Sequence, residues 1–190
     1  MASPAPTSQR LVSLFAKHPC WMIQPLATEM QYSIPSVRRF LSEKGYYSSF
    51  THNGVWYTLR SIPQFGRDGL WFYDHIGFSR AGSLTNTLIA LIVRSPAGMS
   101  AEMLGEKLHC RCHGVLVNLW RKGRVQRQKM GRCHMYFAPD PHVATGQRQV
   151  HLLGHCFRSP RSSASPPKGM YAHAATGSWC RRPGERKCCE

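Results

Sequence analysis

The chain has 190 residues and a formal net charge of +16, because it carries 25 Lys and Arg side chains against 9 Asp and Glu. Hydrophobic residues make up 42% of it, but the longest unbroken apolar run, Leu88 to Val93, is far shorter than the roughly 20 residues that a membrane-spanning helix needs. These values exclude a transmembrane protein. They favour an anionic partner, nucleic acid first, because each phosphate that Lys or Arg neutralises releases a counterion.

The N-terminal segment, Met1 to Thr7, contains neither a basic region nor an apolar one. A secretory signal has both, so we expect a cytoplasmic, nucleoid-associated protein. Cysteines in such a compartment are usually thiols, and we therefore expect the eight cysteines to be unpaired.

Residues 8–60 are predicted to form three short helices followed by a β-hairpin. Ser33 is expected to cap the third helix, Pro35 lies in its first turn, and Gly45 fits the position just past its end. Asn53-Gly54 separates two aromatic-rich alternating runs, which predicts a tight hairpin turn because both central residues need positive φ. The predicted helices cover residues 8–17, 23–30 and 34–44, with a short strand at 20–22 and hairpin strands at 46–51 and 55–59.

Residues 83–140 are predicted to repeat this order of elements. Ser83 is expected to cap the most apolar helix, Ser100 precedes the second helix in a loose capping box, and Gly123 ends the third. The predicted helices cover residues 84–94, 101–108 and 112–122, and the hairpin strands cover 125–129 and 134–138.

Two segments lie outside these halves. Residues 61–82 form an aromatic-rich linker that includes Gly69 to Tyr73 and Ile76 to Phe78. We expect it to pack between the two halves, although an exposed protein-docking strip is an alternative. Residues 141–190 are basic and rich in Pro and Ser, which predicts a disordered tail. A frame-shifted or read-through end would have the same composition.

Three helices followed by a hairpin, found twice, resemble the winged helix-turn-helix superfamily over roughly residues 8–60 and 83–138. A weaker similarity extends to small tandem winged-helix proteins encoded near bacterial mobile elements. The resemblance implies an α+β fold, mainly α with small β-hairpins. It divides the chain into one winged-helix domain at 8–60, a linker at 61–82, a second winged-helix domain at 83–140 and the tail at 141–190.

The resemblance also implies that the third helix of each domain reads bases in the major groove, while Arg and Lys near it contact phosphates. In the first domain the candidate DNA-binding residues are Ser33, Ser36, Arg38 and Arg39 on the helix and His52 and Asn53 on the wing. In the second they are Arg111, His113, Asn118, Arg121 and Lys122 on or beside the helix and Arg124, Arg127, Lys129 and Arg132 on the hairpin. The second domain is the better candidate, because its basic residues are concentrated between Arg121 and Arg132, whereas Glu43 weakens the positive field of the first.

A zinc site is a weaker alternative for Cys110, Cys112, His113, Cys133 and His134. One residue separates Cys110 from Cys112, whereas zinc sites prefer two to four. The winged-helix interpretation also places Cys133 on the wing, away from Cys110. Paired carboxylates, phosphate-binding glycine loops and nucleophile motifs are lacking. We therefore expect neither an enzyme nor a bound metal or cofactor, and no small-molecule substrate is evident.

The sequence thus predicts a protein that binds double-stranded DNA without catalytic activity. A transcriptional regulator or an accessory factor of a mobile element would fit. Two alternatives remain open: a protein–protein adaptor that uses the winged-helix surfaces to dock on a partner, and an RNA-binding protein.

Overall fold

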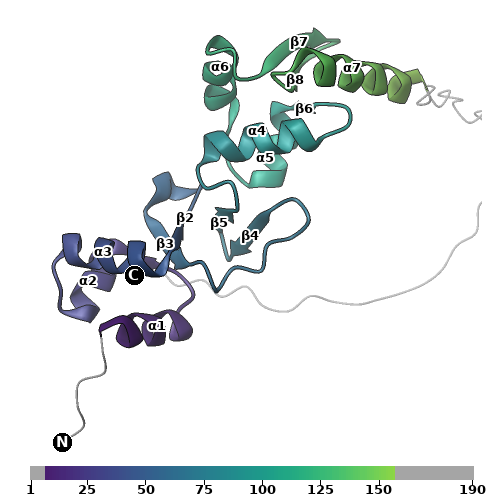
Figure 1. Ribbon diagram of the computed structural model, residues 1–190. Coiled ribbons are helices and arrows are strands. Elements are labelled where there is room, and N and C mark those ends of the chain that lie inside the picture. The colour runs from purple at the N-terminus through teal and green to yellow at the C-terminus, as the bar shows by residue number, and fades with distance from the viewer. Residues whose placement is uncertain (1–6, 157–190) are drawn as a thin grey trace, which may run out of the picture. The chain divides into compact units, whose positions relative to one another are not determined.

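Seven α-helices and three small antiparallel sheets make up residues 7–156, which are the residues that this computed structural model describes (Figure 1). The α+β class expected from the sequence is therefore confirmed. None of the helices in this part of the chain combines the length and the apolar character needed to cross a membrane.

The first half folds around one apolar cluster. Leu11 and Phe15 of the first helix meet Leu26 and Met30 of the second and Val37 of the third, so the helical spacing of apolar residues places one face of each helix inside. A small sheet with the strand order β1-β3-β2 accompanies the helices. The elements are α1 (Thr7–Lys17), β1 (Trp21–Met22), α2 (Ile23–Met30), α3 (Ile34–Lys44), β2 (Tyr46–Ser48), the 3₁₀ turn η1 (His52–Gly54) and β3 (Trp56–Leu59).

The second half repeats this order around its own cluster, in which Leu88 and Ile92 pack with Leu104, Leu108 and Leu116. Its sheet has the order β6-β8-β7, in which the strand between the first two helices again pairs with the last strand of the hairpin. The elements are α4 (Leu84–Arg94), β6 (Met99–Ser100), α5 (Ala101–Leu108), α6 (His113–Arg121), β7 (Gln126–Met130) and β8 (Cys133–Phe137).

The ends of the helices explain why the chain turns where it does. Ser83 and Ser100 cap α4 and α5 through their side chains, which accept hydrogen bonds from the backbone N–H groups of Asn86 and Met103. Ser33 occupies the N-cap of α3, but its hydroxyl bonds to Ser36 Oγ instead of the backbone.

The helix that precedes each third helix ends in the same way. Gln31 after α2 and His109 after α5 both adopt the left-handed conformation, at φ 60° and 52°. The next N–H, from Tyr32 or Cys110, then bonds back to a carbonyl five residues earlier. The same left-handed turn therefore separates α3 from α2 and α6 from α5.

The aromatic-rich linker contains a β-hairpin, β4 (Leu70–Tyr73) and β5 (Ile76–Ser79). Phe78 is fully buried, and Leu70 belongs to the apolar cluster of the second half. The backbone N–H of Phe50 donates to Gly77 O at 2.8 Å. These contacts agree with the expectation that this segment packs rather than lying exposed.

The predicted turn at Asn53-Gly54 is wrong in its length. Both residues do have positive φ, but residues 49–55 form a longer connection that includes η1, and His52 is left-handed as well. The reason is long-range pairing, because Ser49 forms a bridge with Phe78 and the chain leaves the hairpin ladder there.

The predicted start of the tail is also corrected. Residues 141–156 form the helix α7 (Pro141–Cys156). The carboxylate of Asp140 caps its first turn by accepting hydrogen bonds from the N–H groups of His142 and Val143. Ala144 and Gln147 of this helix are buried. The rest of the predicted tail, residues 157–190, lies outside the described residues.

Candidate nucleic-acid interface

Helix α6 is amphipathic, and its packing decides which side chains it presents. Leu116 and Leu119 are buried in the apolar cluster of the second half. His113, Asn118 and Arg121 are exposed on the other side, as predicted for residues that face a partner. Lys122 and Arg124 follow directly and are exposed as well.

The hairpin of β7 and β8 carries a second group of cations. Lys129 pairs with His134 across the ladder, and the turn places Arg132 in solvent next to Gly131, whose φ is +60°. Arg111, in the turn before α6, is also exposed. The exposed cations of the helix and of the hairpin therefore belong to consecutive elements.

Arg127 differs from these residues because it is half-buried. Its guanidinium carbon lies 5.1 Å from the centre of the Trp120 ring and 6.0 Å from that of Tyr136. A cation over two aromatic faces is attracted by both and loses side-chain freedom. Arg127 is therefore held in place by the protein, unlike the long exposed cations around it.

The segment that contains α6 and the hairpin has no carboxylate of its own. No Asp or Glu occurs between Lys107 and Pro139 in the sequence. Desolvation holds the pKa of His134 below its ordinary value, and the nearby charges of Arg127, Lys129 and His113 lower it further. All of these causes disfavour an added proton, as expected where cations gather without a counter-ion.

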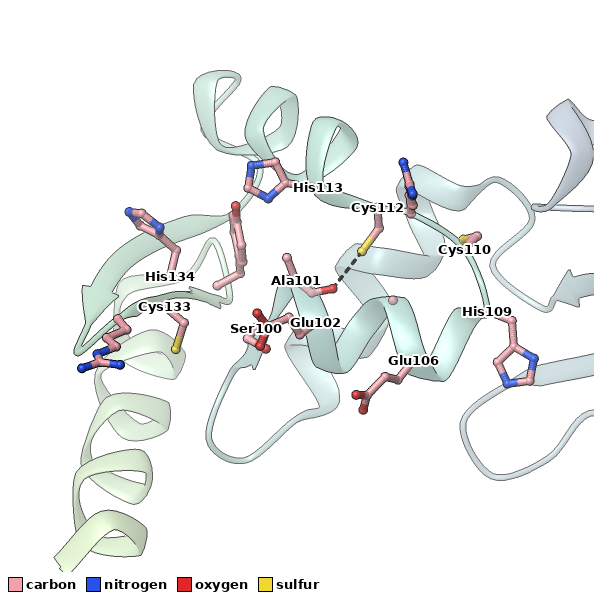
Figure 2. A pocket seen from close by; sticks show the side chains of 14 residues that line it. Ser100, Ala101, Glu102, Glu106, His109, Cys110, Cys112, His113, Cys133 and His134 are labelled. Atoms are coloured by element: carbon pink, nitrogen blue, oxygen red, sulfur yellow. Dashed lines mark hydrogen bonds between the residues drawn. The ribbon is translucent and has the colours of Figure 1, made fainter.

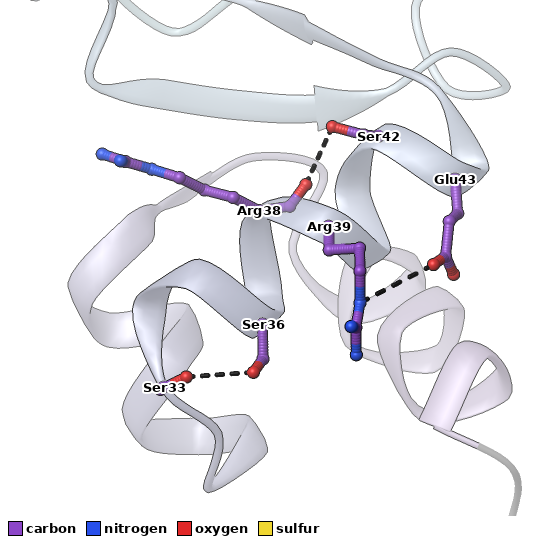
Figure 3. Close-up of polar contacts among 6 residues, drawn as sticks. All are labelled: Ser33, Ser36, Arg38, Arg39, Ser42 and Glu43. Atoms are coloured by element: carbon purple, nitrogen blue, oxygen red, sulfur yellow. Dashed lines mark hydrogen bonds and ion pairs between the residues drawn. The ribbon is translucent and has the colours of Figure 1, made fainter.

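The first half presents a less cationic face (Figure 3). Arg38 and Arg39 are exposed, but Arg39 Nε lies 3.9 Å from Glu43 Oε1, and Ser33 and Ser36 bond to each other at 2.9 Å. An exposed ion pair of this kind contributes little to stability, yet its carboxylate cancels one positive charge on the face that α3 presents.

The predicted wing residues of the first half, His52 and Asn53, are also exposed. The His52 ring bonds to Thr51 Oγ1 at 3.0 Å. Both residues lie in the longer connection described above rather than at a two-residue hairpin tip.

A groove of about 800 Å³ lies beside α5, the α5–α6 turn and the hairpin (Figure 2). His113, Arg132 and His134 line it together with Glu102 and Glu106 of α5. Three of the cysteines considered for zinc, Cys110, Cys112 and Cys133, line it as well.

These cysteines do not assemble into a metal centre. Within residues 7–156, no group of three or more His, Cys, Asp or Glu side chains is arranged to hold an ion. Burial raises the pKa of the Cys110 and Cys112 thiols, and Cys112 Sγ donates a hydrogen bond to Ala101 O.

The sequence did not indicate that Trp120, His134 and the buried Tyr136 lie among these basic residues. Trp120 remains 43% exposed although it lies on α6, and Tyr136 is fully buried beneath Arg127. A tryptophan next to Arg121 at the end of an amphipathic helix was the available signal. The position of Tyr136 depends on the ladder register, in which it pairs with Arg127.

Comparison of the chain with protein-family models, curated sequences and solved structures gives no significant match.

Proposed function

We propose that this protein binds double-stranded DNA through two winged helix-turn-helix units, residues 8–60 and 83–140. The repeated order of helices and strands supports the proposal, and so does the shared left-handed turn before α3 and α6. In each half, the third helix keeps its polar face free while its apolar face packs inside. Such a helix has the dimensions to enter the major groove.

One observation carries the proposal: the α6–hairpin surface, defined by Arg111, Arg121, Lys122, Arg124, Lys129 and Arg132, is exposed and free of acidic neighbours in sequence. Duplex DNA carries about one negative charge per 1.7 Å of its axis, so a continuous cationic surface gains free energy by releasing counterions. We infer that the second half supplies most of the affinity. The resemblance to proteins encoded near mobile elements favours a transcriptional regulator or an accessory factor of a mobile element.

The test replaces Arg121, Lys122 and Arg124 together by Gln in the full chain. The matched control replaces Lys17, Arg67 and Arg94, which are exposed cations outside both α3 and the α6–hairpin surface, so both variants lose three charges. Affinity for duplex DNA is measured by fluorescence anisotropy over a range of salt concentrations. If all three side chains contact phosphates, the slope of log K against log salt falls in magnitude by about 2.7 for the first variant.

The control variant is expected to keep most of the slope, because its charges lie away from the contact. Equal losses in the two variants would show that only net charge matters and would refute a defined interface. Unchanged binding in the first variant would favour the adaptor alternative. Stronger retention of structured RNA than of duplex DNA at matched salt would favour the RNA alternative.

A further inference from the structure

Three buried side-chain donors within residues 7–156 have no partner: the Tyr136 hydroxyl and Arg127 Nε of the hairpin, and Arg148 Nε of α7. Tyr136 is fully buried, yet its hydroxyl is unpaired, and the Nε of Arg127 is buried and unpaired as well. Leaving such a group unsatisfied costs about 1–3 kcal/mol. Because nearly all buried polar groups in proteins are paired, donors that lack an acceptor in the protein alone indicate that a ligand supplies one.

The two donors of the hairpin lie close together. Arg127 pairs with Tyr136 across the β7–β8 ladder, and its guanidinium carbon lies 6.0 Å from the Tyr136 ring. Trp120 of α6 covers Arg127 at 5.1 Å. The aromatic contacts thus fix the guanidinium over the tyrosine, and the missing acceptor has to satisfy donors from two different strands.

The surroundings favour an anion as that acceptor. His113 and Lys129 are near enough, together with Arg127, for their charges to act on His134. Figure 2 shows His113 and His134 on the same side of the groove that Tyr136 lines. Glu102 and Glu106 of α5 line this groove too, but neither is among the charges that act on His134.

The beginning of α6 adds backbone donors to this region. The side chain of its N-cap residue, Cys112, accepts no hydrogen bond from the helix backbone. The backbone N–H groups of the first turn of α6 therefore have no side-chain cap. Gly114 in this turn is exposed, and a Cβ there would meet no other atom within 4 Å. The start of the helix is therefore open to an anion.

We propose that the groove beside α5, the α5–α6 turn and the β7–β8 hairpin is a phosphate-binding site, in which the Tyr136 hydroxyl that lines it and the neighbouring Arg127 Nε donate hydrogen bonds to phosphate oxygens. Arg111 and Arg132, which line the groove, and Lys129, which pairs with His134 in the ladder, supply the surrounding positive charge. The assignment of this phosphate to the backbone of a DNA duplex rests on the proposed DNA-binding function. The same chemistry would bind a free phosphate or the phosphate group of a small molecule.

The test is Tyr136→Phe in the full chain, with Tyr57→Phe in the first half as the matched control. Tyr136→Phe removes only an unpaired hydroxyl and keeps the ring, so the midpoint of thermal unfolding is expected to stay unchanged or rise. Affinity for duplex DNA is expected to fall about tenfold, the value of one hydrogen bond to a charged group. Tyr57→Phe is expected to change neither property.

Titration with inorganic phosphate separates the two sources of the ligand. We follow the His134 imidazole by NMR, because a bound anion raises its pKa toward and above the ordinary value. A rise with both the duplex and millimolar phosphate, smaller in Tyr136→Phe, supports the site on DNA. A rise with phosphate alone keeps the site but refutes the DNA-binding function.

Two results would overturn the site itself. One is an unchanged His134 pKa with either anion. The other is a Tyr136→Phe variant that binds the duplex as tightly as the wild type, which would leave the DNA-binding function standing and remove only the phosphate site.

Discussion

Gln147 holds α7 on the second half through three hydrogen bonds, and its replacement by Leu tests that attachment. The side chain is 4% exposed. Its Nε2 donates to Ile92 O at 2.8 Å and to Ser95 O at 2.7 Å, and its Oε1 accepts from the N–H of Ala138 at 2.9 Å. A single amide therefore joins the end of α4, the chain after β8 and α7.

Leu has a similar size but leaves all three backbone groups without this partner. At about 1 kcal/mol for each hydrogen bond, Gln147→Leu is expected to lower the free energy of unfolding by about 3 kcal/mol. The matched control is Gln149→Leu, because Gln149 is exposed on the same helix and its replacement is expected to change stability by less than about 0.5 kcal/mol.

Urea unfolding followed by circular dichroism measures both values. Equal stability of Gln147→Leu and the wild type would contradict the reasoning, because it would mean that α7 is not anchored through this amide. A loss of 3 kcal/mol in the control would mean that substitutions anywhere on α7 disturb it, and the hydrogen bonds would then not explain the effect.

Two further predictions concern the turn before β6 and the acid that joins the linker to α5. Gly98→Ala is expected to destabilise the fold by at least about 2 kcal/mol in urea unfolding, because the φ of Gly98 is +70° and a Cβ would lie 2.6 Å from a Phe137 ring carbon. The control Gly123→Ala has a similar φ of +67° but open space around the Cβ, so it measures the cost of the backbone conformation alone. An equal loss of stability in the two variants would refute the steric clash at Gly98. Burial by itself would raise the pKa of Asp68, but hydrogen bonds from Lys107 and from a backbone N–H, together with the Lys107 charge, lower that pKa overall. The ionised Asp68 therefore stabilises the fold above the ordinary pKa of 3.8, and this stabilisation is lost as the pH falls through the lowered pKa. Asp68→Asn should flatten this acid limb in unfolding experiments between pH 5 and 2, and an unchanged slope there would contradict the assignment.

The sequence indicated most of the helices because their determinants are local. Apolar spacing placed α4 and α6, and Ser83 and Ser100 cap the helices that they were expected to cap. The exposure of the basic residues on α6 followed from the same spacing, since Leu116 and Leu119 fix which face is buried.

What the sequence did not indicate depends on contacts between distant residues. Strand β6 has only two residues and exists because it pairs with β8. Residues 141–156 of the predicted tail form a helix that Gln147 and the buried Ala144 attach to the second half, and the sequence of this helix has no apolar stripe that would indicate the attachment. The unpaired Tyr136 hydroxyl likewise appears only when the ladder register brings it under Arg127.

The two halves share an architecture but differ in the charge on the face of the third helix, and this difference assigns them different roles under the DNA-binding proposal. Packing uses only the inner face, so the outer residues can diverge without any cost to the fold. In the first half, Glu43 opposes Arg39 on α3, whereas the segment that forms the α6–hairpin surface contains no Asp or Glu of its own. Counterion release therefore concentrates affinity in the second half. The first half has hydroxyl groups on its helix, and Arg38 and Lys44 are the cations there outside the Arg39–Glu43 pair. It is suited to adjusting which duplex is bound rather than how tightly.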